Sequence, residues 1–259
     1  MLEPRMVKRE IRDRYDEMGE AARKEVARYS DPGRLWRVVE GDTPALAYFR
    51  RRKVETALSL GEFTRGSAIV EIGSGTGDYS LLLTRSGYRL TGVDLSSKSI
   101  QAARAKASIL GVSDISFVVS DAEALSEIPE NSADGVVSFS ALRYVPDLRQ
   151  ALLAIRRVLK PNGVAVLDFP NRFCPWFRLL KTHFGVERHI HDQQYSTREI
   201  VTLMREAGLV DVTARRILFT TYVLPAPLLP LFRAIDWVGE RTPGISQTAG
   251  IIMVRGRKA

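Results

Sequence analysis

Residues 68–78 read A-I-V-E-I-G-S-G-T-G-D and are the most informative segment of the chain. A short apolar run ends at Gly73, and two more glycines follow at positions 75 and 77. Glycine adopts positive φ angles at low cost and lets a ligand approach the backbone, so the pattern predicts a strand that turns tightly into a helix beside a ligand. Dinucleotides, phosphates and sulfonium nucleosides all bind to loops of this kind.

Short apolar segments that resemble strands buried on both faces recur around this loop. They lie at residues 68–73, 90–95, 115–120, 135–139 and 164–169. Helical segments alternate with them: 96–110, 147–160 and a third that opens with a capping box from Ser196 to Glu199 and ends at Gly208. The alternation predicts an α/β fold with a Rossmann-like, doubly wound sheet and helices on both faces.

The ends of the chain depart from this alternation. Residues 1–66 are predicted to form an N-terminal helical cap of the same domain, and residues 67–259 the core, with insertions at 171–195 and 219–249. Segments 210–218 and 250–255 predict a final pair of strands around the second insertion. That insertion is apolar, but prolines, Arg233 and Asp236 interrupt it, which argues against a transmembrane helix.

Composition limits the functional classes. With 259 residues and 45% hydrophobic content, the chain can bury a substantial core, and its single cysteine, Cys174, excludes an intrachain disulfide. The charged N-terminus lacks the apolar stretch of a signal peptide, so a cytoplasmic protein is expected. The formal charge of +8 includes the basic run 50–53. Such runs form either solvated helix faces or a patch for nucleic acid or lipid headgroups, and acidic residues interleaved along the N-terminus favour the former.

The spacing around the glycines separates the three kinds of ligand. A dinucleotide loop would place a third glycine at position 78, which is Asp, and a P-loop would end in G-K-[ST], which is absent. S-adenosylmethionine carries an ammonium and a sulfonium in place of a pyrophosphate, so its site should offer carboxylates. Glu71 and Asp78 flank the glycines as such a cationic ligand requires.

Two more carboxylates stand at predicted strand ends. Asp94 ends the second strand, where a carboxylate can accept both ribose hydroxyls. Asp121 follows the third strand, where it can accept the amine of adenine while the backbone N–H of Ala122 donates to a ring nitrogen. Since parallel strands bring these ends to one edge of the sheet, the sequence predicts a nucleoside site there.

The motifs V-E-I-G-S-G-T-G, G-V-D-L-S, V-V-S-D-A-E-A-L and R-V-L-K-P-N-G-V-A-V-L follow one another in this order. Together they resemble the class I S-adenosylmethionine-dependent methyltransferases, and most closely the small-molecule group that includes the ubiquinone and menaquinone biosynthesis enzymes. The resemblance implies a seven-stranded, mostly parallel sheet with an antiparallel last strand. It also implies that the cofactor contacts Glu71, Gly73, Ser74, Gly75, Gly77, Asp78, Asp94, Leu95, Asp121, Ala122 and Ser138.

The catalytic machinery is less evident, because in-line methyl transfer needs alignment and, for some acceptors, only removal of a proton. The three histidines, His183, His189 and His191, fall in the insertion 171–195. Their H-x-H-D pattern is a weak metal signal, and no metal is expected. His189 or His191 is a candidate base, although a lid loop that fixes Tyr195 is the favoured interpretation; these three residues are the candidate catalytic set.

The acceptor is expected to be a small molecule. The N-terminal cap and both insertions are rich in aromatic and aliphatic residues that can roof an apolar pocket, which favours a lipophilic or aromatic acceptor. Flanking arginines add peripheral membrane contact as a further prediction. The absence of an N-P-P-Y-type tetrapeptide after the fourth strand argues against methylation of a nucleic-acid base. An RNA methyltransferase and a non-catalytic cofactor-binding subunit stay as alternatives, and the methylated atom and the oligomeric state are left open.

Overall fold

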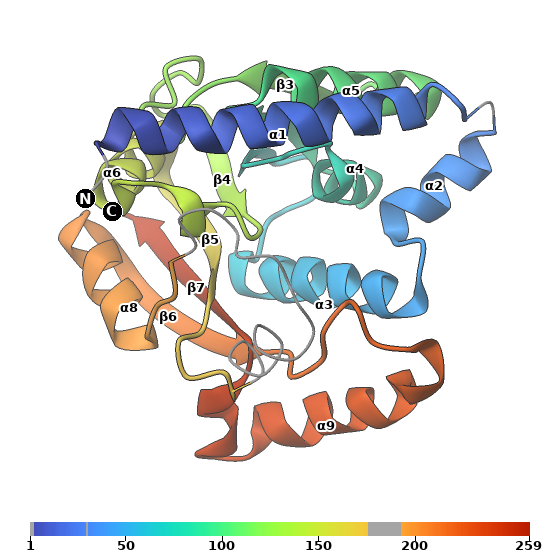
Figure 1. Cartoon of the computed structure of the whole chain (residues 1–259). Helices are drawn as coiled ribbons and strands as arrows, with labels where there is room; N and C mark the ends of the chain where they lie inside the picture. The colour runs from blue at the N-terminus through green and yellow to red at the C-terminus, as the bar shows by residue number, and fades with distance from the viewer. Residues whose placement is uncertain (1–2, 30, 176–192) are drawn as a thin grey trace.

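The computed structural model of the chain describes residues 3–29, 31–175 and 193–259 (Figure 1). Its centre is a seven-stranded sheet in the order β3-β2-β1-β4-β5-β7-β6. The strands are β1 (Ala68–Ile72), β2 (Arg89–Asp94), β3 (Ile115–Val119), β4 (Ala133–Ser138), β5 (Leu159–Pro170), β6 (Leu209–Ile217) and β7 (Ile251–Lys258).

The sheet is mostly parallel. Strands β1 to β5 run in one direction, and β7 is antiparallel to both of its neighbours, β5 and β6. The predicted Rossmann-like sheet with an antiparallel last strand is therefore confirmed. The order of the strands reverses at β1, which lies between β2 and β4, so β1 marks the topological switch point of the sheet. Open α/β sheets bind ligands at this point, beyond the carboxyl ends of the strands.

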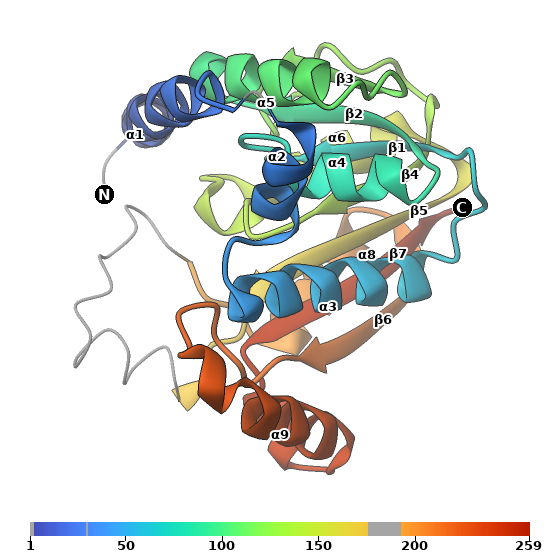
Figure 2. The same cartoon turned by 90° about the vertical axis from the view of Figure 1, so that its right-hand side faces the viewer.

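Helices cover both faces of the sheet. They are α1 (Pro4–Val26), α2 (Pro32–Glu40), α3 (Pro44–Gly61), α4 (Asp78–Arg85), α5 (Ser97–Ile109), α6 (Leu148–Val158), α8 (Thr197–Glu206) and α9 (Leu229–Arg241), with short 3-10 turns η1 (Leu142–Tyr144), η2 (Ala226–Leu228) and η3 (Ile245–Thr248). In both views α1 runs along α5 at one end of the molecule, while α9 lies at the opposite end (Figures 1 and 2).

The alternation of side chains along the strands divides the core into two layers. Ile69 and Val137 face the layer built with α3 and α4, whereas Val70 and Val136 face the layer built with α6 and α8. All four side chains are buried. Strands buried on both faces have almost continuous apolar sequences, which is why these segments are recognisable without a structure.

Local signals place most ends of the three helices predicted by residue range correctly. Ser196 and Glu199 form the predicted capping box at the start of α8, and Gly208, with φ of 82°, follows its end. The helix predicted over 147–160 is wrong at its end, because α6 stops at Val158 and β5 already begins at Leu159. There Leu159 pairs with Ala133 of β4, so sheet formation overrides the helical pattern.

The segment between β6 and β7 connects two paired antiparallel strands. It contains η2, α9 and η3, and it is fastened by the buried Asp236, whose Oδ1 accepts hydrogen bonds from the backbone N–H groups of Phe219 (2.5 Å) and Thr220 (3.0 Å). In the part of the chain that the structure describes, every helix is too short or too polar to cross a membrane.

Candidate functional site

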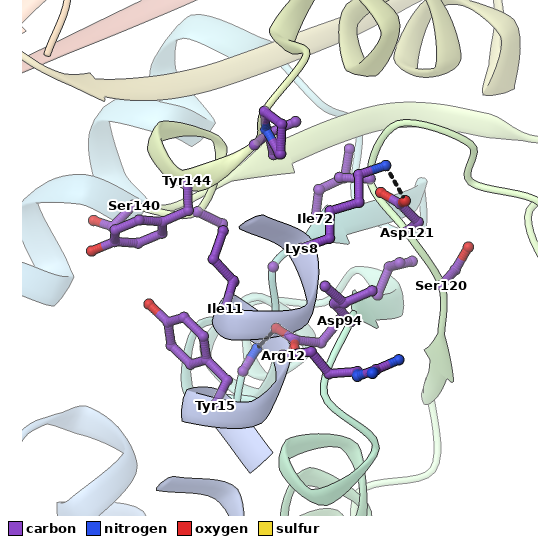
Figure 3. A pocket seen from close by; sticks show the side chains of 18 of the residues that line it. Lys8, Ile11, Arg12, Tyr15, Ile72, Asp94, Ser120, Asp121, Ser140 and Tyr144 are labelled. Atoms are coloured by element: carbon purple, nitrogen blue, oxygen red, sulfur yellow. Dashed lines mark hydrogen bonds and ion pairs between the residues drawn. The ribbon is translucent and has the colours of Figure 1, made fainter. Parts of the chain in front are cut away.

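A cavity of about 250 Å³ lies where the carboxyl ends of β1, β2, β3 and β4 meet. Loops that follow these strands form one side, and the inner face of α1 forms the other (Figure 3). The cavity lies at the switch point of the sheet, where such folds bind ligands. Six of the residues predicted to contact a cofactor line it: Gly73, Gly75, Asp94, Leu95, Asp121 and Ala122.

The glycine loop turns from β1 into α4 under the cavity. Gly73, Gly75 and Gly77 all have positive φ angles, of 71°, 51° and 83°, which other residues rarely adopt. A Cβ at Gly73 would lie only 2.0 Å from the Cβ of Ala141. No atom lies within 4 Å of a Cβ built at Gly75, so the backbone there is open to a ligand.

Asp94 ends β2 and holds the loop in place. Its Oδ2 accepts a hydrogen bond from the backbone N–H of Gly75 (2.8 Å), and its Oδ1 accepts one from Ser96 (2.9 Å). Burial raises the pKa of Asp94, and these N–H donors oppose that rise. Each carboxylate oxygen has two lone pairs, so Asp94 keeps the capacity to accept further hydrogen bonds from a ligand in the cavity.

Asp121 follows β3 and meets the N-terminal helix. Lys8 of α1 lies 2.6 Å from Asp121 Oδ2 (Figure 3). The same Nζ lies 2.5 Å from Glu123 Oε2. These two ion pairs tie α1 to the loop after β3. Together with Ile11, Arg12 and Tyr15, which lie on the same face of α1 at helical spacing, Lys8 forms the wall opposite the glycine loop.

Glu71 and Asp78, the two acids beside the glycines, differ in their surroundings. Glu71 is buried in β1, accepts a hydrogen bond from the Ser80 hydroxyl through Oε2, and has no hydrogen-bond partner for Oε1 among the described residues. Burial raises its pKa to about 8. Asp78 lies between Arg50 (2.8 Å) and Lys106 (2.5 Å) and does not line the cavity.

A family model described as a methyltransferase domain matches residues 70–167. The match includes the glycine loop, Asp94 and Asp121. The ubiquinone biosynthesis O-methyltransferase of Paracidovorax citrulli is 28% identical over 155 residues, which are 60% of this chain and 65% of that protein. In residues 70–167 and in its fold, the chain is similar to the class I S-adenosylmethionine-dependent methyltransferases.

The relatives of this chain carry the names of different activities. The S-adenosyl-L-methionine-dependent Diels-Alderase iccD of Talaromyces variabilis is 31% identical over 183 residues, which are 64% of this chain and 61% of that protein. The chain therefore spans less than two thirds of the length of either curated relative. A crystal structure of a S-adenosylmethionine-dependent methyltransferase from Thermotoga maritima has the same fold, with 20% identity, a TM-score of 0.59 and coverage of 86% of this chain and 93% of that one.

S-adenosylmethionine is the cofactor of these methyltransferases, and two features at this end of the sheet fit it, although Glu71 itself does not line the cavity. The open backbone at Gly75 leaves room for a ligand, and Oε1 of Glu71 is a buried acceptor with no donor in the described residues. An unpaired polar atom in the core is costly unless a ligand or water satisfies it. A cationic methionine end would supply the missing donor.

Other predicted residues lie away from the cavity lining. Ser138 is fully buried, and its hydroxyl donates to the Ile72 carbonyl between β4 and β1 (2.9 Å). Tyr195 packs its ring edge-on against Phe169, with centroids 5.3 Å apart, and its hydroxyl donates to Gln193 Oε1. Tyr195 therefore packs in the core, and its catalytic role stays a prediction. His183, His189 and His191 lie outside the described residues, and the described ones contain no cluster of three metal-ligating side chains.

Ser74 and Gly77 complete the predicted set. Ser74 is buried beneath the loop, and its hydroxyl has no partner among the described residues. Gly77 is the residue before α4, where a Cβ would lie 2.9 Å from the Phe117 ring. Ser74 and Gly77 therefore lie on the buried side of the loop, and neither residue lines the cavity.

The sequence did not indicate that the inner face of α1 lines the cavity, and it favoured a solvated face for the basic run 50–53. In the structure, each of the four side chains of this basic run has an acidic partner: Arg50 with Asp78, Arg51 with Glu55, Arg52 with Glu240 and Lys53 with Asp168. Lys53 is wholly buried, so the solvated-face interpretation is wrong for it. A helical spacing of Lys8, Ile11, Arg12 and Tyr15 was visible in the sequence, but nothing local indicates what that face covers.

Proposed function

We propose that this protein is a methyltransferase that transfers a methyl group from S-adenosylmethionine to a small lipophilic or aromatic acceptor. The observation that carries the proposal is that the glycine loop, Asp94 and Asp121 surround one cavity at the switch point of the sheet. S-adenosylmethionine would supply an electrophilic methyl group, whose bond to sulfur breaks, leaving its electron pair on sulfur, as an acceptor lone pair forms the new bond. The protein's own contribution is alignment in a dry site.

Asp94 and Asp121 are the residues assigned to the nucleoside. The unused lone pairs of Asp94 would accept the two ribose hydroxyls, and Asp121 with the N–H of Ala122 would bind the adenine edge. Lys8 already donates to Asp121 Oδ2, but a carboxylate oxygen can accept from two donors at once. The adenine amine and Lys8 would thus share this carboxylate, which would close α1 over the bound nucleoside.

The methionine end is assigned to the glycine loop and Glu71. The loop N–H groups and the buried carboxylate of Glu71 would face the amino-acid part of the cofactor. A cationic neighbour favours the ionised form of a carboxyl group, which opposes the effect of burial on the Glu71 pKa. Cofactor binding is therefore expected to release a proton from Glu71.

Binding of S-adenosylhomocysteine and methyl turnover test the proposal. Calorimetry on the whole chain should show a 1:1 complex, and labelled S-adenosylmethionine should transfer its methyl group to a lipophilic acceptor. Stabilisation by NAD in place of S-adenosylhomocysteine would contradict the cofactor assignment.

A second candidate function comes from the relatives. The Talaromyces variabilis relative is named as a S-adenosyl-L-methionine-dependent Diels-Alderase, so a related scaffold carries a cyclisation activity. If this chain catalysed a cyclisation, a polyene would cyclise in the presence of S-adenosylmethionine, and the labelled methyl group would stay on the cofactor. Formation of labelled product separates the two functions.

We also propose peripheral membrane contact through α9. Leu231, Ile235 and Val238 follow one another at helical spacing and are 58%, 38% and 51% exposed. Arg233 and Arg241 flank this face on the same helix, and both are exposed. An exposed apolar helix face beside arginines is the composition of a helix that lies in a membrane interface, and a lipophilic acceptor would be reached from there.

A further inference from the structure

An open groove of about 590 Å³ lies between α3 and α9 and, in the described part of the chain, shares no lining residue with the cofactor cavity. Both views place α9 below α3 (Figures 1 and 2). Arg51 and Arg52 of α3 and Arg233 and Arg241 of α9 line this arginine groove. Four guanidinium groups around one groove create a positive potential that attracts anions.

The acidic side chains around the arginine groove neutralise only part of this charge. Asp236 is buried, and its carboxylate accepts hydrogen bonds from the backbone of the segment after β6. Glu240 pairs with Arg52 at 2.7 Å. Glu55 lies 3.7 Å from Arg51, but both side chains are more than half exposed, so water and salt weaken this pair. Arg51 therefore keeps most of its capacity to bind an anion.

Aromatic rings hold three of the guanidinium groups in place. Cζ of Arg233 lies 5.5 Å from the centre of the Tyr48 ring, and Cζ of Arg51 lies 6.0 Å from the same ring. Cζ of Arg241 lies 4.8 Å from the centre of the Trp237 ring. Neither Arg233 nor Arg241 forms an ion pair with a residue that the structure describes. Contact with a ring orients a guanidinium and leaves N–H donors for an anion.

The arrangement of these donors favours a phosphate group as the anion. A guanidinium presents its N–H groups as a rigid planar fork that matches the oxygens of a phosphate. The oxygens of a tetrahedral phosphate point in different directions, so forks from both walls of the groove can bind it together. A flat carboxylate has its two oxygens in one plane, which suits a single fork.

The neighbouring face of α9 indicates the source of the phosphate. Leu231, Ile235 and Val238 are exposed on this helix, and its groove residues lie roughly 100° away around the helix axis. Trp237, which lines the groove, is 62% exposed, and tryptophan is typical of the boundary between headgroups and acyl chains. A lipid whose headgroup lay in the groove would have its acyl chains beside the apolar face.

We propose that the arginine groove binds the phosphate of an anionic phospholipid headgroup, with Arg51, Arg233 and Arg241 as the donors. This rests on the membrane contact proposed above for α9. The apolar face of α9 gives affinity for lipid surfaces in general, whereas the arginine groove makes binding depend on the headgroup.

Sedimentation of the whole chain with vesicles tests the proposal. Vesicles of phosphatidylglycerol in phosphatidylcholine should bind the chain about tenfold more tightly than vesicles of phosphatidylcholine alone, because the arginines repel the choline ammonium. Equal binding to both refutes the phosphate site and leaves the membrane contact of α9 intact. Binding to neither refutes the membrane contact and this inference with it.

Titration with sn-glycerol 3-phosphate, followed by NMR, separates a lipid phosphate from a soluble one. A chain that binds this small molecule but not the phosphatidylglycerol vesicles would have a site for a soluble phosphate, and the lipid assignment would be wrong.

The double variant Arg233→Lys/Arg241→Lys separates a built site from general attraction between charges. Lysine keeps the positive charge but lacks the planar fork. Binding to phosphatidylglycerol vesicles should weaken about tenfold or more, the effect of one hydrogen bond to a charged group. Arg149→Lys/Arg205→Lys is the matched control, since both arginines are exposed on other helices, and it should bind normally. Equal loss in both variants, or no loss in either with thermal transitions unchanged, would overturn the proposal.

Discussion

At the scale of single residues, carboxylates in apolar surroundings are the most informative side chains of this protein. Glu71 lies within β1, Asp94 ends β2, and Asp168 lies within β5, and the side chains of Glu71 and Asp168 are at most 2% exposed. A buried charge is costly unless it is paired or bound to a ligand. Each of the three carboxylates therefore indicates a partner. In the structure, Glu71 accepts a hydrogen bond from Ser80, Asp94 accepts from the backbone of Gly75 and Ser96, and Asp168 pairs with Lys53.

Asp94→Ala should weaken binding of S-adenosylhomocysteine at least tenfold. The substitution removes the proposed acceptor of both ribose hydroxyls, and hydrogen bonds to a charged group contribute about 1.5–3 kcal/mol each. Calorimetric titration measures the effect. Asp114→Ala is the matched control, since Asp114 is exposed before the opposite end of β3. A folded Asp94→Ala variant with wild-type affinity would refute the ribose assignment.

Glu71 should make the stability of the ligand-free protein depend on pH. Its pKa is about 8 in the folded state, against 4.5 for an ordinary glutamate, so the folded chain holds a proton that the unfolded chain has lost. The free energy of unfolding should therefore fall as the pH rises from about 4.5 to about 8, with a slope approaching ~1.4 kcal/mol per pH unit. Below that window the contribution of Glu71 is constant.

Urea unfolding at several pH values within this window measures the slope. Glu71→Gln is the matched variant, because the amide has the same shape and does not titrate. It should flatten the curve, and an unchanged slope would show that other groups cause the dependence.

At the scale of elements, α1 is the part that turns an open crevice into a cavity. It contributes Lys8, Ile11, Arg12 and Tyr15 to the wall, and it packs closely against α5. The contact depends on Gly19, where a Cβ would lie 2.4 Å from the backbone nitrogen of Ser99. Substrate access and nucleoside binding are therefore both expected to depend on how α1 is docked.

Gly19→Val should raise the dissociation constant of S-adenosylhomocysteine about tenfold or more. The valine must push α1 away from α5, and overpacking of this kind costs roughly 1–3 kcal/mol. Met18→Val places the same side chain on the exposed face of the same helix, where Met18 is 53% exposed, and should bind normally. Equal affinity of both variants, with helix content preserved, would show that α1 does not contribute to the site.

At the scale of the whole molecule, the two ends have different surfaces. Helices α1 and α9 lie at opposite ends (Figures 1 and 2). Residues of α1 line the cofactor cavity, and α9 exposes apolar side chains. A second cavity, of about 130 Å³, is lined by residues 218–222, which lead directly from β6 towards α9. A lipophilic acceptor bound from a membrane at α9 would thus enter on the side away from the nucleoside.

Leu231→Glu/Val238→Glu should reduce binding to anionic vesicles about tenfold or more. Burial of one large aliphatic side chain contributes about 1.5–3 kcal/mol, and each substitution replaces that gain with a charge. Vesicle co-sedimentation measures the bound fraction. Val119→Glu/Leu153→Glu is the matched control, since both residues are exposed but lie outside α9. Equal loss in both variants, or none in either, would refute a specific role for α9.

The sequence by itself determined the strands, most ends of the three helices predicted by residue range, the glycine loop, and Asp94 and Asp121 at the sheet edge. These features are local: apolar runs, capping residues and glycines with positive φ act within a few residues, and parallel strands necessarily bring their carboxyl ends together. The same reasoning that singles out Glu71 applies to Asp168, which also interrupts an apolar strand.

Only the tertiary structure decided how the charges are paired. Asp78 is held by Arg50 and Lys106 and is kept out of the cavity, while Lys53, part of a run that reads as surface, is buried against Asp168. The partners lie far apart in the sequence, and no local pattern encodes which of many lysines and acids will meet. Charge pairing depends on the three-dimensional packing of α3, α5 and the sheet, because Coulomb interactions act through space and become strong only where water is excluded.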